Sequence, residues 1–409
     1  MRKVTERVVM SFTCFAMFFG AGNLIFPAFL SYQAGGNTVF AFLGFILSAI
    51  TLPVLSLIAV GISGSLDHLS ARVNPLFSKV FTIVIYLAIG PMLAIPRTAS
   101  TSFEMVRMAF NLEGRIFSWM YSLVFFLLAG IISLHPEKLS KRLGKVLSPI
   151  LIVLIIFLFV GVFFMPSSSP SAVSPYDEKP LFTGILDGYQ TMDAIAGLVF
   201  GTILAINLRK IGKEDEEEVR REGVVSAIGG GVLLLIIYLL LAVIGYRSFS
   251  IVDSPKTGAD ILSAAASFLL PSTGRILIAA IFILACFNTS VGLLSSCGEY
   301  FSSMCPSLSR GRWIFIFAFI SGLIANVGLD AIISISSPIL EVIYPVAITL
   351  MLLAFIKDSE RLSLTYKLSI PVAFIFSLIG IFTSLSFLWL IPTGATAFVS
   401  FLFERRKIK

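Results

Sequence analysis

The chain has 409 residues, of which 57% are hydrophobic and only 13% are charged. Because a soluble domain carries about a quarter charged residues, this composition excludes a water-soluble globular protein and predicts a chain whose solvent is the bilayer. The formal net charge of +7 does not indicate nucleic-acid binding, since the sequence has no basic stripe interleaved with aromatic residues.

A helix that crosses the membrane needs about 20 apolar residues, and about twelve such stretches follow one another in this sequence. They predict an all-α polytopic membrane protein with a single transmembrane domain over residues 1–409, surrounded by membrane lipids. In chain order the predicted spans are 8–30, 38–62, 79–98, 116–134, 146–165, 183–208, 223–246, 275–299, 313–328, 331–356, 368–384 and 387–403.

The first span contains the sequence FGAGNLIFP between Phe19 and Pro27. Glycine is a poor helix former and Pro27 has no N–H to donate, so we expect the helix to unwind near the middle of the membrane. Freed carbonyl groups can bind a cation, and freed N–H groups at the start of the second half-helix can bind a carboxylate. The alternative is a continuous helix whose small residues allow close helix packing.

Two charged residues, Arg97 and Glu104, lie near the outer end of the third span. They are two helical turns apart and therefore lie on one helix face. Ionisable residues within spans usually pair with one another or with backbone carbonyls. We therefore expect an ion pair between Arg97 and Glu104, either as part of a gate or as a structural contact.

The sixth span is polar where a span should be apolar, in the stretch DGYQTMDAIAG from Asp187 to Gly197. A carboxylate such as Asp193 in the middle of a span costs at least ~2.5 kcal/mol, so it should face the protein interior. Interrupted spans at positions 1 and 6 are what two inverted repeats of five helices produce. The predicted organisation is a first repeat over 8–165, a second over 183–356, and two additional helices over 368–403.

The eighth span carries Cys286, Thr289 and Ser290, which share a helix face because residues i, i+3 and i+4 point together. Two hydroxyl oxygens combined with carbonyls from a broken helix could form a compact oxygen cage for a monovalent cation. The alternative is that both hydroxyls bond back to carbonyls one turn earlier in their own helix.

Lys and Arg residues are distributed unevenly between the two sides that the spans define. With the N-terminus inside, 23 of the 30 lie in inside connectors, and cytoplasmic connectors are rich in these residues. The asymmetry predicts that both termini are cytoplasmic and that the number of spans is even.

Four stretches are distinctive: FFGAGNLIFP at 18–27, GPMLAIPRTASTSFE at 90–104, GYQTMDAIAGLVF at 188–200 and PILEVIYP at 338–345. In these motifs, and over essentially its whole length, the chain resembles the bacterial branched-chain amino acid:cation symporters. That family has the leucine-transporter-like fold of the amino acid–polyamine–organocation superfamily. The resemblance implies sodium-coupled symport of leucine, isoleucine and valine by alternating access in the bacterial inner membrane, with no organic cofactor.

The resemblance also implies roles for individual residues. The unwound segment would hold the amino and carboxyl groups of the substrate, and span 6 would complete the pocket. The implied substrate-binding residues are Gly20, Ala21, Gly22, Asn23, Asp193, Ala194 and Gly197. The implied sodium ligands are the carbonyls of Ala16 and Phe19 and the hydroxyls of Thr289 and Ser290. Some members carry a Lys in span 5 where this sequence has Leu151, which favours sodium over proton coupling.

Three other functions are alternatives. The nearest is a proton-coupled amino acid transporter, or one of broader specificity. A membrane-embedded enzyme should display paired catalytic residues such as HExxH or GxSxG, and neither motif is present. A channel should have a ring-forming filter, whereas two broken helices in one chain favour alternating access. We therefore expect a transporter and not an enzyme.

Overall fold

The computed structural model describes residues 2–134, 150, 152–166, 170–210 and 215–408. The predicted span 146–165 is therefore described only in part, and Leu151 lies outside the described residues. No strand occurs in the described part of the chain, and the all-α prediction is confirmed. The α-helices are α1 (Arg2–Phe18), α2 (Ala21–Ala34), α3 (Thr38–Ile46), α4 (Leu52–Ser63), α5 (Leu66–Ala71), α6 (Pro75–Leu87), α7 (Ala94–Phe110), α8 (Arg115–Ser133), α10 (Pro180–Tyr189), α11 (Asp193–Lys210), α12 (Glu216–Arg247), α13 (Gly258–Leu269), α14 (Gly274–Met304), α15 (Arg310–Ala325), α16 (Leu329–Ala354), α17 (Ser363–Thr383) and α18 (Leu390–Ile408).

Several helical segments are long and apolar enough to cross a membrane. Within the described residues seven segments qualify, or eight when α10 and α11 count as one bent span. One of them, Gly22–Ser63, has 42 residues, which is about 60 Å of helix at 1.5 Å per residue. It contains a 3₁₀ turn at Gly35–Asn37, and α2 and α3 pack against each other across that turn. This segment covers parts of two predicted spans, and the total of twelve spans stays a prediction.

The predicted break in the first span is present, although it is shorter than expected. α1 ends at Phe18 and α2 begins at Ala21, and Gly20 between them has an extended backbone with φ −132° and ψ −163°. The N–H of Gly20 donates to Oδ1 of Asn23 at 3.0 Å, where a continuous helix would use the carbonyl of Ala16. Asn23 thus stays inside α2 and closes the break with its side chain.

The sixth span is broken between Tyr189, where α10 ends, and Asp193, where α11 begins. The two helices are bent by 44° at this point. Met192 has a φ of +62°, a left-handed conformation that is uncommon for a residue with a side chain and that a right-handed helix cannot contain. The break therefore lies in the polar stretch that the sequence singles out.

A third break, which was not predicted, interrupts the third span. α6 ends at Leu87 and α7 begins at Ala94, and Gly90 between them has non-helical angles of φ −93° and ψ −130°. Pro91 follows it; proline lacks the N–H that a continuous helix needs and disfavours helical angles at the preceding residue. The predicted span 79–98 is thus not one continuous helix, and the Gly-Pro dipeptide is the signal for the break.

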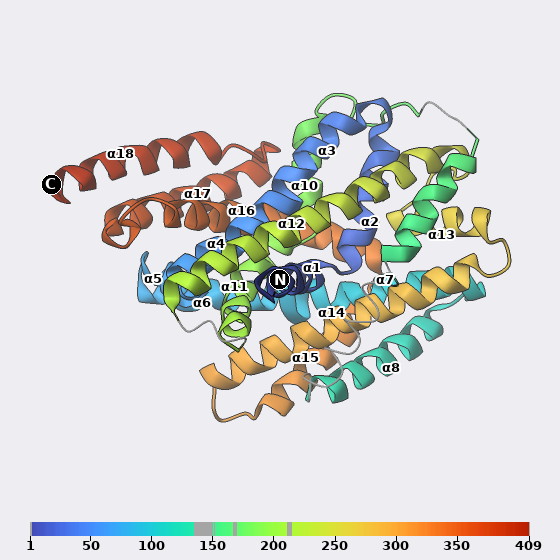
Figure 1. Cartoon of the computed structure of the whole chain (residues 1–409), viewed down its shortest axis with the longest axis horizontal. Coiled ribbons are helices and arrows are strands. Elements are labelled where there is room, and N and C mark those ends of the chain that lie inside the picture. Colours follow the sequence, from blue (N-terminus) through green and yellow to red (C-terminus); the bar gives the residue numbers. More distant parts are fainter. Residues whose placement is uncertain (1, 135–149, 151, 167–169, 211–214, 409) are drawn as a thin grey trace.

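The helices form two main groups (Figure 1). In the first, α1 and α2 pack along α12, while α10 packs along α3 and α11 along α4, so that each broken span lies against a helix from the other half of the chain. We call this group the bundle. In the second, α7, α8, α14 and α15 pack against one another, and we call this group the scaffold. α16 packs against α4, α7 and α10, and α17 and α18 follow it at one edge of the molecule.

Glycines make the closest contacts inside the bundle. A Cβ added at Gly184 in α10 would overlap the backbone carbonyl of Ala41 in α3. The first broken span has a similar contact, because a Cβ added at Gly245 in the neighbouring helix α12 would overlap the backbone of Ala28 in α2. Small residues allow helix backbones to approach closely in a membrane, where van der Waals packing drives helix association. Both broken spans are therefore held by tight contacts with a neighbouring helix.

Replacing Gly184 by valine should lower the stability of the folded protein, because the added side chain meets the backbone of Ala41. Overpacking costs typically about 1–3 kcal/mol. Gly61→Val in α4 is the matched control, since nothing lies within 4 Å of a Cβ added there. Thermal unfolding of the detergent-solubilised variants measures the difference. Equal melting temperatures for the two variants would contradict the tight α3–α10 contact.

Candidate functional site

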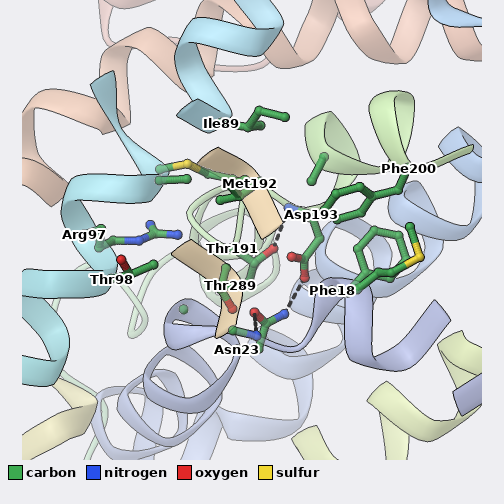
Figure 2. A pocket seen from close by; sticks show the side chains of 16 residues that line it. Phe18, Asn23, Ile89, Arg97, Thr98, Thr191, Met192, Asp193, Phe200 and Thr289 are labelled. Atoms are coloured by element: carbon green, nitrogen blue, oxygen red, sulfur yellow. Dashed lines mark hydrogen bonds between the residues drawn. The ribbon is translucent and has the colours of Figure 1, made fainter. Parts of the chain in front are cut away.

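A small cavity lies where the two broken spans face the scaffold (Figure 2). Its volume is about 40 Å³, and a water molecule needs about 10–15 Å³ on this measure, so the cavity has room for a few water-sized groups. Its polar lining residues are Asn23, Arg97, Thr98, Thr191, Asp193 and Thr289. Apolar side chains that cover much of the remaining wall belong to Met17, Phe18, Ile89, Met192, Phe200 and Leu293.

Asn23 and Asp193 join the two broken spans at this cavity (Figure 2). The Asn23 amide nitrogen donates to Oδ2 of Asp193 at 2.5 Å, and also to the hydroxyl oxygen of Tyr238 in α12. The Tyr238 hydroxyl donates in turn to the same Asp193 oxygen at 3.2 Å. All three residues are at most 4% exposed. One carboxyl oxygen therefore connects both broken spans with α12.

Arg97 is the positively charged residue of the cavity. It lies in the first turn of α7, is 4% exposed, and points its guanidinium group into the cavity (Figure 2). Its Nη1 donates to the carbonyl of Gln190 at 2.5 Å, and the guanidinium carbon lies 5.5 Å from the centre of the Phe26 ring. The scaffold thus contacts both broken spans through this one side chain.

The predicted ion pair between Arg97 and Glu104 is wrong. Glu104 instead pairs with Arg107, with Oε2 and Nη2 2.7 Å apart. Those two residues are one helical turn apart, whereas Glu104 and Arg97 are separated by two turns, or about 10 Å along the helix axis. The carboxylate therefore pairs with the nearer arginine towards the C-terminal end of α7, and Arg97 stays in the buried cavity.

The hydroxyl groups of α14 lie beside the break in the first span. A Cβ added at Gly20 would be 3.1 Å from Oγ1 of Thr289. That hydroxyl donates to the carbonyl of Ala285 at 3.1 Å, which leaves its lone pairs for another group. Oγ of Ser290 is buried and has no hydrogen-bond partner in the described part of the chain. The structure thus brings Thr289 to the broken helix, and cation binding there stays a prediction.

Four of the seven predicted substrate residues line the cavity, namely Gly20, Gly22, Asn23 and Asp193. The other three, Ala21, Ala194 and Gly197, are not among its lining residues. Ala194 is buried but is not among the lining residues. Gly197 is a packing residue, because a Cβ added there would overlap the side chain of Ser56 in α4. Ala21 is the first residue of α2. Substrate binding by these residues stays a prediction.

Tyr238 belongs to the site but was not predicted. It lies in a long apolar helix, 45 positions after the carboxylate to which it donates. A hydroxyl in the middle of an apolar span is a weak signal of such a role, because a buried Tyr O–H usually has a partner. The identity of that partner depends on how α12 packs against both broken spans, which no local pattern in the sequence reveals.

The sequence matches the family model described as branched-chain amino acid transport protein over residues 3–403. The chain belongs to this family. The branched-chain amino acid permease BraB of Bacillus subtilis is 38% identical to it over 357 residues, which are 86% of this chain and 80% of that protein. The branched-chain amino acid permease BrnQ of Lactobacillus delbrueckii subsp. lactis is 36% identical over 390 residues, covering 93% of this chain and 87% of that protein.

The fold is that of a transporter of known structure. Mhp1, a nucleobase-cation-symport-1 family transporter solved in a closed conformation with bromovinylhydantoin bound, matches with a TM-score of 0.66. The match covers 97% of this chain and 93% of that one at 13% identity. This member of the branched-chain amino acid transport protein family is therefore a multi-pass membrane transporter and not an enzyme. The predicted family is confirmed.

Tyr238→Phe should destabilise the protein more than Tyr121→Phe does. Tyr238 donates to a buried carboxylate, and hydrogen bonds to charged groups contribute about 1.5–3 kcal/mol against about 0.5–1.5 kcal/mol for neutral partners. Tyr121 is the matched control, because its hydroxyl donates to the neutral Ser102 hydroxyl at 2.8 Å. Unfolding in detergent provides the measurement. A smaller loss of stability for Tyr238→Phe than for Tyr121→Phe would rule out the proposed strength of the Tyr238–Asp193 hydrogen bond.

Proposed function

We propose that this protein takes up leucine, isoleucine and valine across the bacterial inner membrane by sodium-coupled symport. The observation that carries the proposal is a small cavity, lined by both polar and apolar side chains, at the meeting point of two broken helices in a chain of this family. Relatives at 36–38% identity are named branched-chain amino acid permeases. Broken helices at such a site are the usual way in which secondary transporters expose backbone groups to a substrate and its coupling ion.

The start of α2 suits the carboxylate of an amino acid. The first N–H groups of a helix have no acceptor within it and, together with the helix dipole, they favour an anion. At Ala21 and Gly22 these groups lie next to the cavity, since Gly20 and Gly22 line it. Asp193 contributes a carboxyl group to the same cavity and can accept a hydrogen bond from the substrate ammonium group. Apolar side chains such as Phe18 and Phe200 then surround the branched side chain.

The end of α1 suits an alkali cation. The Ala16 carbonyl loses the donor it would have in a continuous helix, because the Gly20 N–H goes to Asn23. Thr289 lies across the break from Gly20, and the buried Ser290 hydroxyl has no partner among the described residues. Hard cations prefer oxygen ligands. The proposed sodium ligands are the carbonyls of Ala16 and Phe19 and the hydroxyls of Thr289 and Ser290.

Transport requires the bundle to move relative to the scaffold. The cavity lies between these two groups of helices and, at about 40 Å³, has room for only a few water-sized groups. A substrate can therefore enter or leave only when the two groups separate on one side of the membrane. Each broken span packs on a helix of the other half, which supports two inverted repeats of five helices within twelve spans. In this arrangement both termini are cytoplasmic.

A proton-coupled or broader amino acid transporter is the second candidate, and the position of Asp193 favours it. This carboxyl group is 4% exposed and lies at the cavity. Buried carboxylates in membrane proteins often belong to proton relays, so Asp193 could carry a proton during transport instead of leaving the coupling to sodium.

Purified protein in liposomes should accumulate labelled leucine when an inward sodium gradient is imposed at equal pH. An inward proton gradient without sodium should not drive accumulation, and unlabelled isoleucine and valine should compete with leucine. Accumulation driven by the proton gradient alone would support the second candidate. Absence of leucine uptake under both gradients, with the protein shown to be inserted and folded, would refute both functions.

Thr289→Ala should shift the sodium activation of leucine uptake to higher concentrations and leave the relative uptake of leucine, isoleucine and valine unchanged, because Thr289 lies at the proposed ion site. Ser296→Ala is the matched control: its hydroxyl also bonds one turn back, to Gly292 at 3.0 Å, but it lies further along α14 and is not among the residues that line the cavity. Identical sodium activation curves for Thr289→Ala and wild type would remove Thr289 from the site.

A further inference from the structure

Arg97 carries a buried positive charge that no carboxylate of the described residues neutralises by direct contact. A guanidinium group has five N–H donors, and the hydrogen bond to the Gln190 carbonyl is the one that Arg97 makes within the described residues. Glu104, on the same helix, pairs with Arg107 instead. Asp193 shares the cavity, but its Oδ2 accepts from Asn23 and Tyr238. Asp193 lies in the same cavity without pairing directly with the guanidinium, so Arg97 keeps N–H donors that a further anion can use.

The N-terminal ends of two helices also lie at this cavity beside Arg97. Ala94, the first residue of α7, lines the cavity, and Gly20 and Gly22 place the start of α2 there as well. The N-terminal end of each helix carries a partial positive charge. A cation in the first turn of α7 is therefore in an unfavourable position unless an anion joins it. The guanidinium and two helix N-termini all favour the same kind of ligand.

Gly22 brings the guanidinium and the α2 backbone together. A Cβ added at Gly22 would lie 3.1 Å from Nη2 of Arg97 and 3.2 Å from the Phe26 ring. The absence of a side chain therefore leaves open the space between the guanidinium and the α2 backbone. A planar carboxylate can accept two parallel N–H bonds from a guanidinium group. The guanidinium is thus placed to contact a carboxylate that lies beside the first turn of α2.

We infer that Arg97 binds the α-carboxylate of the substrate, between the guanidinium group and the N-terminal end of α2. This inference rests on the proposed function and assigns the selectivity for free amino acids to one residue. Asp193 lies on the bundle side of the same cavity (Figure 2), where it receives the ammonium group. The two opposite charges of the cavity then match the two charges of a zwitterion, and a compound that lacks the carboxylate leaves Arg97 unpaired.

Binding of L-leucine and L-leucinamide to the purified full-length protein tests this role, because the amide replaces the carboxylate by a neutral group of similar size. Wild type should prefer leucine strongly. Arg97→Gln should weaken leucine binding by roughly 30-fold or more, the loss typical of a broken buried charge pair, and should change leucinamide binding little. Glutamine removes the charge but keeps an amide donor at this position, although its side chain is shorter than that of arginine.

Arg107→Gln is the matched control, since it removes the same charge from the same helix at a partly exposed position outside this cavity. It should leave both affinities unchanged. Arg97→Lys serves if Arg97→Gln does not fold: it keeps the charge but loses the bidentate geometry, so leucine binding should weaken while leucinamide binding does not.

Two results would overturn the role of Arg97: a folded Arg97→Gln or Arg97→Lys variant that keeps the wild-type preference for leucine over leucinamide, or one that weakens both ligands equally. A wild type that transports leucine normally in either case would leave the proposed function intact. A wild-type protein that binds no branched-chain amino acid would instead refute the proposed function itself.

Discussion

A helix that breaks inside a membrane leaves backbone polar groups with no water to satisfy them, and the structure of this protein depends on how those groups find partners. At the first break, the Asn23 side chain accepts from the N–H of Gly20. At the second, the Thr191 hydroxyl donates to the carbonyl of Gly188 and Arg97 donates to that of Gln190. These three side chains also line the cavity. The side chains that satisfy the backbone groups at the breaks therefore also face the cavity that a ligand would occupy.

The same constraint explains why the breaks lie at helix–helix contacts. Unsatisfied backbone cannot face lipid, so each broken span must be covered along its length. Gly184 and Gly245 allow this coverage, because a side chain at either position would overlap the backbone of the adjacent helix. The broken spans consequently share a tightly packed bundle, and the ligand-facing side of each break is turned towards α7 and α14.

Local signals were sufficient to predict the class of the protein and two of its breaks. Glycine, proline and polar residues within an apolar run reveal an interrupted helix directly, which is why the breaks at Gly20 and at Gln190–Met192 could be expected. The pair Gly90-Pro91 carries the same kind of signal, but it lies in a stretch whose apolar length alone suggested a continuous span. The family, too, could be identified from motifs around the breaks.

Tertiary contacts could not be predicted in the same way. The contact of Tyr238 with Asp193 and that of Gly197 with Ser56 join residues from different helices, and their partners depend on how the helices pack. The partner of Arg97 was predicted wrongly because sequence spacing favours contacts along one helix. In the structure the carbonyl of Gln190, at the break in the sixth span, accepts a hydrogen bond from Arg97, which was expected to pair with Glu104.

The meeting of Asn23, Tyr238 and Asp193 at a single carboxyl oxygen has a mechanical consequence. Two stretches of chain donate hydrogen bonds to one oxygen atom of a third, and the two donors also bond to each other, so sliding one stretch past the others by about one ångström would lengthen at least one of these contacts. Such a junction resists shear but places no restriction on rotation of all three together. The junction therefore holds α2, α11 and α12 in register with one another.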